Sequence, residues 1–324
     1  MPMMAINATR PRSEGFSHEA LMYADMEGFL DGTLPFLREG IGGGEAIFVV
    51  VSAEKIAILQ GELGDDAGSV RFRDMGEIGL NPARIIPAWR DFADASAAGG
   101  RPFRGIGEPI WATRTAAALA ECQRHESLLN LAFADSGPFR LLCPYDTTAL
   151  SPDVIAEAHH SHPVIVEGTD QRESSSCRTL DAVAAPFDWP LPDPPENVQV
   201  LDFGIESLRQ VRDFVGRFAR IAGLMPSRVD DLVLAANEVA TNSVRHGGGH
   251  GLLSVWCDND SITCEVRDAG RIVDPMAGRQ RGKGDAEGGL GLWIANQLCD
   301  LVQVRCFPTA GVVRLHMVLT TVDI

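Results

Sequence analysis

Two polar side chains stand out in an alanine-rich, apolar segment, LAANEVATNSVRHG, which runs from Leu234 to Gly247. Glu238 and Asn242 are four residues apart, a spacing that puts both side chains on one face of a helix. A carboxylate and a carboxamide are costly to bury there without a partner, and a magnesium-bound nucleotide is such a partner. Asn242 can offer a neutral oxygen to the metal, and Glu238 can orient or deprotonate a water or hydroxyl.

Two later segments support a nucleotide site. The segment CEVRDAGRIVDP, residues 264–275, predicts an alternating strand that ends at Asp268, with Gly270 directly beyond it. The segment GGLGLWIANQLCD, residues 288–300, predicts a glycine loop that opens an amphipathic helix. Free backbone N–H groups and the helix dipole make such a helix start a binding site for phosphate.

This order of helix, strand, glycine-rich segment and helix resembles the GHKL ATPase fold, the Bergerat-type site of histidine kinases and gyrase. The form EVATNSVRHG is most similar to the anti-sigma-factor serine kinases. The resemblance covers roughly the last third of the chain. It implies that Asn242 binds magnesium and that Glu238 is the catalytic base.

The same resemblance implies further roles along the chain. Asp268 would accept a hydrogen bond from the adenine amino group, and Gly270 would leave room for the purine. Gly289, Leu290 and Gly291 would form the loop that cradles phosphate. ATP and Mg²⁺ are therefore the expected cofactors.

The chain departs from the family pattern at two places. Ile272 stands where the strand-end motif usually has a second glycine, and Val312 and Val313 stand where the last strand usually carries a threonine. Both changes bear on nucleotide affinity rather than on the fold. The glycine-rich segment 271–287 is either a phosphate lid or a solvated loop. Its basic residues are Arg271, Arg279, Arg281 and Lys283.

The composition bounds the class of protein. The chain has 324 residues, enough for two domains, with 45% hydrophobic and 22% charged residues. A net charge of −16 argues against nonspecific binding of nucleic acid. We expect a cytoplasmic protein, because no stretch is apolar enough to cross a membrane and the N-terminus lacks a signal core. Seven cysteines without a spacing pattern favour reduced thiols, although Cys257 and Cys264 flank a turn and could pair.

Five prolines in residues 184–197 predict a stiff linker. Before it, helices and short apolar strands alternate, which is typical of a largely parallel α/β layer sheet. We predict helices over 21–37, 53–62, 82–98 and 116–133 and strands over 45–51, 70–74, 101–105 and 139–144. After the linker, an amphipathic helix is predicted over 205–222. The predicted fold is an α/β layer-sheet domain followed by an α+β GHKL domain.

The first half carries a second resemblance. The segments FSHEALMYAD, ECQRHESLLNLAF, LLCPYD and HHSHPVI are similar to the MEDS domain of methanogen and methylotroph sensors of the DcmR type. The similarity covers about residues 16–167 and implies the sensing of small, hydrocarbon-like molecules.

Gly40 to Gly44 do not form a P-loop, because they precede a strand and no Gly-Lys-Ser/Thr follows. We therefore expect a flexible N-terminus at 1–15, a sensory domain at 16–167, a linker at 168–197 and an ATPase domain at 198–324.

Several residues of the first half invite other interpretations. His125 lies in RHESLLN, which is similar to the phospho-acceptor box of histidine kinases, but it precedes a strand and a linker instead of leading into the ATPase domain. A structural or ligand-facing role is favoured for it. Tyr145 ends a strand where open α/β sheets bind ligands, although core packing is favoured. A metal could bind the histidines near residue 160, but their spacing matches no known ligand pattern and a helix C-terminus favours histidine anyway. These candidates are His159, His160 and His162, together with Cys143 or His18.

The sequence thus predicts a signalling regulator. We expect an anti-sigma factor and serine/threonine-protein kinase that binds ATP and Mg²⁺, phosphorylates a STAS-type antagonist and sequesters a sigma factor. A small molecule bound by the first domain would control it, and a homodimer is compatible with this function. The alternatives are a sensor histidine kinase and a nucleotide-binding interaction module without kinase activity.

Overall fold

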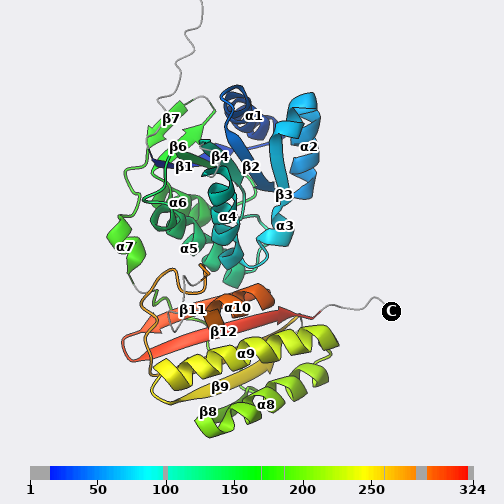
Figure 1. Cartoon of the computed structure of the whole chain (residues 1–324), viewed down its shortest axis with the longest axis vertical. Coiled ribbons are helices and arrows are strands. Elements are labelled where there is room, and N and C mark those ends of the chain that lie inside the picture. The colour runs from blue at the N-terminus through cyan, green and yellow to red at the C-terminus, as the bar shows by residue number, and fades with distance from the viewer. Residues whose placement is uncertain are drawn as a thin grey trace, which may run out of the picture.

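The chain folds into two units, each built on its own sheet, which are stacked along the long axis of the molecule (Figure 1). The computed structural model describes residues 15–97, 101–168, 170–185, 187–258, 260–281 and 290–319. The predicted fold class, an α/β unit followed by an α+β unit, is confirmed. No helix within these described ranges is long and apolar enough to cross a membrane.

The first unit is a seven-stranded sheet in the order β3-β2-β4-β5-β1-β6-β7. Neighbouring strands are parallel, except that β6 and β7 are antiparallel. The strands are β1 (Phe16–Tyr23), β2 (Ala46–Val51), β3 (Val70–Asp74), β4 (Phe103–Gly107), β5 (Phe139–Asp146), β6 (Val164–Glu167) and β7 (Asp170–Glu173). The helices are α1 (Met26–Gly42), α2 (Ala53–Leu63), α3 (Met75–Ile78), α4 (Ile85–Ala97), α5 (Ala116–Ala132) and α6 (Pro152–Ser161), with 3₁₀ turns η1 (Gly64–Ser69) and η2 (Pro82–Arg84).

The central strands of this sheet are buried on both faces. In β2, Phe48 and Val50 pack into the core beneath α4 and α5, while Val49 and Val51 pack into a second core that includes α1 and α2. Parallel strands covered by helices on both sides read as continuous apolar runs, which is why EAIFVVV predicts a strand. The remaining predicted helices and strands of this unit lie within a few residues of their observed bounds.

One predicted helix of the first unit begins too early. The helix predicted over 21–37 is confirmed from Met26 onward as α1, but residues 21–23 are the end of strand β1. Asp25 separates the two, because its side chain accepts a hydrogen bond from the backbone N–H of Gly28 and so begins the helix. The preceding residues pair instead with β5 and β6, a long-range contact that local sequence does not indicate.

The second unit is a five-stranded antiparallel sheet in the order β11-β12-β10-β9-β8. The strands are β8 (Gln199–Gly204), β9 (His250–Cys257), β10 (Ser261–Asp268), β11 (Leu301–Phe307) and β12 (Ala310–Val318). One face of this sheet is covered by helices, which pack on it to form the apolar core of the unit. They are α8 (Leu208–Ile221), which follows the 3₁₀ turn η3 (Ile205–Ser207), α9 (Pro226–His246) and α10 (Leu290–Leu298). All seven cysteines are free thiols, and Cys257 faces Ile262 rather than Cys264 across the strands.

The opposite face of this sheet is polar, and the proline-rich segment runs across it. Glu265 and Arg314 form a buried ion pair with a distance of 2.5 Å between Oε2 and Nε. The backbone carbonyls of Phe187, Trp189 and Pro192 accept hydrogen bonds from the Cys306 N–H, the Arg305 guanidinium and the Arg314 guanidinium. Residues 187–192 of the predicted linker therefore lie along the second sheet. The start of the predicted linker instead forms β7 of the first sheet, and the short helix α7 (Leu180–Ala184) contacts α5.

Candidate functional site

Helix α9 presents Glu238 and Asn242 to the start of α10. Its buried side, which includes Ala235 and Val239, packs on the sheet, while the side chains of Glu238 and Asn242 are half-buried beside it. Gly291 of α10 lies against both. A methyl group on Gly291 would come within 2.8 Å of Asn242 Nδ2 and 3.4 Å of Glu238 Oε2. These three predicted site residues therefore converge, and the approach requires glycine at position 291.

Asp268 ends β10 beside the C-terminus of α9. Its Oδ1 accepts a hydrogen bond of 2.7 Å from the N–H of Gly270, and the N–H of Ala269 donates to the carbonyl of Gly247. A methyl group on Gly247 would lie 2.5 Å from Asp268 Cγ. Two glycines thus allow the end of the strand to pack closely on the end of the helix.

A cavity of about 300 Å³ opens between these elements. Three predicted site residues, Asn242, Asp268 and Gly270, line it together. Leu290 is 56% exposed and does not line this cavity, and Gly289 lies outside the described residues. The remaining lining residues are Val239, Ser243, His246, Gly247, Arg271, Ile272, Val273, Asp274, Ala277, Leu292 and Val313.

Both departures from the family pattern bear on this cavity. Ile272 and Val313 line its wall, so apolar side chains occupy the places where the pattern has glycine and threonine. Val312 pairs with Arg267 and is fully buried, outside the cavity lining. The wall next to Asp268 is consequently more apolar than the family pattern implies.

The segment that follows β10 is held against the first unit. Met276 packs into the core of the first unit, among the side chains beneath α4 and α5. Arg279 is 4% exposed, and its Nη2 lies 3.4 Å from Glu121 Oε2 on α5. The described part of the predicted lid, residues 271–281, therefore contacts the first unit through Met276 and Arg279. The rest of the lid, including Lys283, lies outside the described residues.

Helix α10 is a second contact between the units. Asn296 Nδ2 donates to the carbonyl of Gly278, and Asn296 Oδ1 accepts a 3.0 Å hydrogen bond from Asn81 Nδ2 of the first unit. The Arg84 guanidinium donates to the carbonyls of Asn296 and Cys299 at the C-terminus of α10. A cation at this end of a helix is favourable because it meets the negative end of the helix dipole.

The first unit has a further cavity, of about 340 Å³, at the carboxyl ends of its parallel strands. Lys55 Nζ lies 2.5 Å from Glu108 Oε1 and 2.7 Å from Tyr23 Oη, and all three side chains line this cavity. Burial raises the pKa of Glu108, against the lowering effect of Lys55. The sequence analysis missed these residues because they are far apart in the chain: Tyr23 ends β1, Lys55 lies in the first turn of α2, and Glu108 follows β4. Tyr145 is buried in the core and does not line this cavity, in agreement with the core packing favoured for it.

The structure also places the histidines of the first unit. His125 is 1% exposed on α5, in keeping with the structural role favoured for it, and its Nδ1 has no hydrogen-bond partner among the described residues. His159 and His160 lie at the end of α6, with His160 42% exposed beside Glu157. His18, His162 and Cys143 instead converge in the interior. The favoured interpretation of these last three as unrelated structural residues missed that convergence.

Comparison with known proteins gives a class to each unit. Residues 17–163 match the model of the MEDS domain, the methanogen/methylotroph, DcmR sensory domain. Residues 203–317 match the model of the histidine kinase-like ATPase domain. Both resemblances seen in the sequence are thereby confirmed, and the chain combines a MEDS-type sensory region with a GHKL-type ATPase region.

Individual proteins and solved structures add less information about the function of this chain. No curated protein matches the chain. One solved structure that it matches is that of the RsbU and RsbW domains of Rv1364c from Mycobacterium tuberculosis, with 18% identity and a TM-score of 0.28. The match covers 37% of this chain and 32% of that one, so the chain spans about a third of the length of that protein.

Proposed function

We propose that this protein is an ATP-dependent serine/threonine-protein kinase and anti-sigma factor whose activity is set by its sensory region. The observation that carries the proposal is the convergence of Glu238, Asn242 and Gly291 beside the cavity that Asp268 lines. A carboxylate, a carboxamide and a glycine-bounded helix start suit hydroxyl activation, metal binding and phosphate binding, in that order.

The residues around the cavity fit ATP and Mg²⁺. Asn242 supplies the oxygen for the metal, and Asp268 the acceptor for the adenine amino group. Bound magnesium would offset the negative charge of the phosphates. Glu238 lies one helical turn from Asn242 and would take the proton of the attacking hydroxyl. The N–H groups at the start of α10, around Leu290 and Gly291, would face phosphate, with Gly289 completing that loop.

The burial of His125 favours a protein substrate over an internal histidine. This histidine is enclosed by the first unit's core, and burial lowers its pKa to about 3. A phosphoryl group could reach it only after α5 leaves the sheet. The alternative of a sensor histidine kinase with His125 as acceptor is therefore disfavoured.

The partners in this proposal are a sigma factor and a STAS-type antagonist in the cytoplasm. They rest on the likeness of EVATNSVRHG to the anti-sigma serine kinases. The contacts of Glu121 and Asn81 with the ATPase unit support control by the sensory region, because a ligand that shifts α5 or η2 would move groups bonded to the lid and to α10.

The test starts with calorimetric titration of the full chain with ATP, with and without Mg²⁺. The proposal requires magnesium-dependent binding, followed by transfer of the γ-phosphoryl group to a serine or threonine of the STAS protein that copurifies with the chain. ATP binding without phosphoryl transfer to any copurifying protein would favour the alternative, an interaction module that binds nucleotide but is not a kinase. The apolar side chains of Ile272 and Val313 in the cavity wall would fit that alternative. The absence of binding at millimolar ATP would exclude both.

A further inference from the structure

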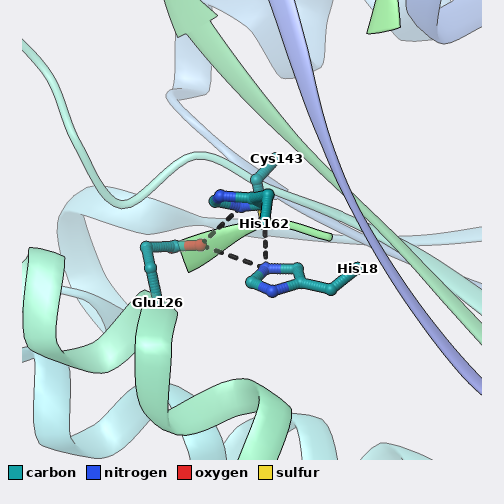
Figure 2. Close-up of side chains that lie close together, drawn as sticks. All are labelled: His18, Glu126, Cys143 and His162. Carbon is teal, nitrogen blue, oxygen red and sulfur yellow. Dashed lines mark hydrogen bonds and ion pairs between the residues drawn. The ribbon is translucent and has the colours of Figure 1, made fainter. Parts of the chain in front are cut away.

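Four potential metal ligands meet inside the first unit, away from the nucleotide site. His18 comes from β1, Glu126 from α5, Cys143 from β5, and His162 from the turn between α6 and β6 (Figure 2). The ligand atoms all lie within 4.8 Å of one another, and all four residues are buried. Side chains from four separate elements thus point at one small volume of the core.

The hydrogen bonds on the far side of each imidazole fix its orientation. His18 Nδ1 lies 3.2 Å from Asn130 Oδ1, and the amide of Asn130 is held in turn by a 2.6 Å bond from Nδ2 to the carbonyl of Ser161. His162 Nδ1 lies 2.9 Å from the carbonyl of Ala158. Asn130 Oδ1 and the Ala158 carbonyl can only accept, and the Ser161 hydroxyl, which also lies 3.1 Å from His162 Nδ1, directs its hydrogen to the carbonyl of Glu157 or Ala158. Each Nδ1 therefore carries the proton, and each Nε2 directs a lone pair towards the cluster.

The centre of the cluster consequently has too many acceptors. Two imidazole lone pairs and the Glu126 carboxylate converge, and only the Cys143 thiol has a hydrogen to offer. His162 Nε2 and Glu126 Oε1 are buried and have no hydrogen-bond partner in the described part of the chain. A bound cation would satisfy all four groups at once.

Three of the six distances between the ligand atoms lie close to the edges of a tetrahedron. His18 Nε2 and His162 Nε2 lie 3.2 Å and 3.1 Å from Glu126 Oε2, and Cys143 Sγ lies 3.4 Å from His18 Nε2. Ligands bound at about 2.0–2.3 Å to zinc lie about 3.3–3.8 Å apart in a tetrahedron. Two nitrogens, one sulfur and one carboxylate oxygen are ligands that zinc accepts, whereas magnesium and calcium prefer oxygen alone.

We propose that His18, Glu126, Cys143 and His162 form a closed Zn²⁺ site in the sensory region. Four protein ligands leave no open position, which is typical of a structural or sensing site rather than a hydrolytic one. On binding, a Zn–S bond replaces the S–H bond of Cys143 and the proton passes to the solvent. The site ties β1, β5 and the end of α6 to α5, the helix that also carries Glu121.

The test uses the full chain, stripped of metal with a chelator and titrated with Zn²⁺. We expect one zinc per chain by elemental analysis. Substitution with Co²⁺ should give the visible bands of tetrahedral cobalt together with a thiolate-to-cobalt charge-transfer band. Wild-type protein that binds no zinc, or a cobalt spectrum without the thiolate band, would overturn the proposal without recourse to any variant.

Variants then assign the ligands. Cys143→Ser should abolish the charge-transfer band, and Asn130→Ala should weaken zinc binding by roughly the 10- to 100-fold that loss of an outer hydrogen-bond partner costs. Cys122→Ser is the matched control, because Cys122 is also buried but lies on α5 and donates to the carbonyl of Pro109. An unchanged zinc affinity and spectrum in Cys143→Ser, or a loss in Cys122→Ser equal to that in Cys143→Ser, would contradict the assignment.

Discussion

Glu121 of the sensory region holds two arginines of the ATPase region at once. Its Oε1 lies 2.7 Å from Arg305 Nη1 on β11, and its Oε2 lies 3.4 Å from Arg279 Nη2 in the segment after β10. The carboxylate and both guanidinium groups are buried. One side chain of α5 therefore neutralises charge both in the second sheet and in the segment that borders the nucleotide cavity.

The first prediction concerns this buried triad. Glu121→Gln should lower the free energy of unfolding by about 3–5 kcal/mol, because it leaves two buried guanidinium groups without a counter-charge. Chemical denaturation of the full chain measures the change. Asp213→Asn is the control: it removes an exposed pair with Arg209 and should cost at most about 1 kcal/mol. Equal effects of the two substitutions would show that Glu121 does not compensate the two arginines.

The second prediction concerns Asn242. Asn242→Ala should weaken ATP binding in the presence of Mg²⁺ and have much less effect when magnesium is chelated, because the carboxamide acts through the metal. Asn237→Ala on the same helix is the control, since its side chain accepts from Arg212 and does not line the cavity. Paired calorimetric titrations give the result. Equal weakening in both conditions would assign Asn242 to direct contact with the nucleotide.

The third prediction concerns Gly291. In Gly291→Ala, the added methyl group would come within 2.8 Å of Asn242 Nδ2, so ATP affinity should fall sharply while the protein stays folded. Gly61→Ala is the control. It lies in helix α2, a methyl group there meets nothing within 4 Å, and the substitution should raise stability by about 0.5–1 kcal/mol. Thermal unfolding and ATP titration of both variants separate loss of the site from loss of the fold.

The fourth prediction concerns chemistry. Glu238→Ala should retain ATP but slow phosphoryl transfer to the proposed STAS-type substrate by about 100- to 10,000-fold, the usual loss when a general base is removed. Transfer of radiolabel from ATP measures the rate. An undiminished rate in this variant would assign the role of base to another residue.

The fifth prediction concerns pH. His316 lies between Thr263 Oγ1 and Gln303 Oε1, and burial, followed by the charge of Arg314, lowers its pKa to about 4. An unfolded histidine titrates near 6.5, so stability is intact above this value and falls as the pH drops towards 4. The loss from this residue should be about 3 kcal/mol at most. Denaturation of the wild type and of His316→Gln at several pH values gives the slope of the free energy of unfolding against pH, and the two slopes should differ below pH 6.5. Equal slopes would show that His316 is already charged in the folded protein.

Sequence patterns predicted the elements whose residues are contiguous. The run EAIFVVV identifies a doubly buried strand, and the boxes around Asn242, Asp268 and Gly291 are local enough to be found by spacing. The structure brings these residues together, and their chemical roles remain predictions. Strand β1 was missed because FSHEALMY has no strand pattern of its own and is extended only through its pairing with β5 and β6.

Sequence analysis raised His18, Cys143 and His162 as possible metal ligands without favouring them, and it did not predict that they form a cluster with Glu126. Its members belong to four elements and are separated by long stretches of chain, so no ligand spacing exists to be recognised. The same holds for Lys55, Glu108 and Tyr23, which meet only because parallel strands end at one edge of the sheet. Contacts between Glu121 and Arg279 likewise depend on how the two units dock.

The amide of Asn296 joins Gly278 beside the cavity to Asn81 of the sensory region, and this arrangement has a consequence for the signal itself. Thermodynamic linkage is reciprocal: a ligand that alters nucleotide affinity through these bonds has its own affinity altered by the nucleotide, by the same factor. The threshold at which the sensory region responds would then follow the energy charge of the cell. A starved cell and a well-fed cell would then respond differently to the same concentration of the ligand that the sensory region binds.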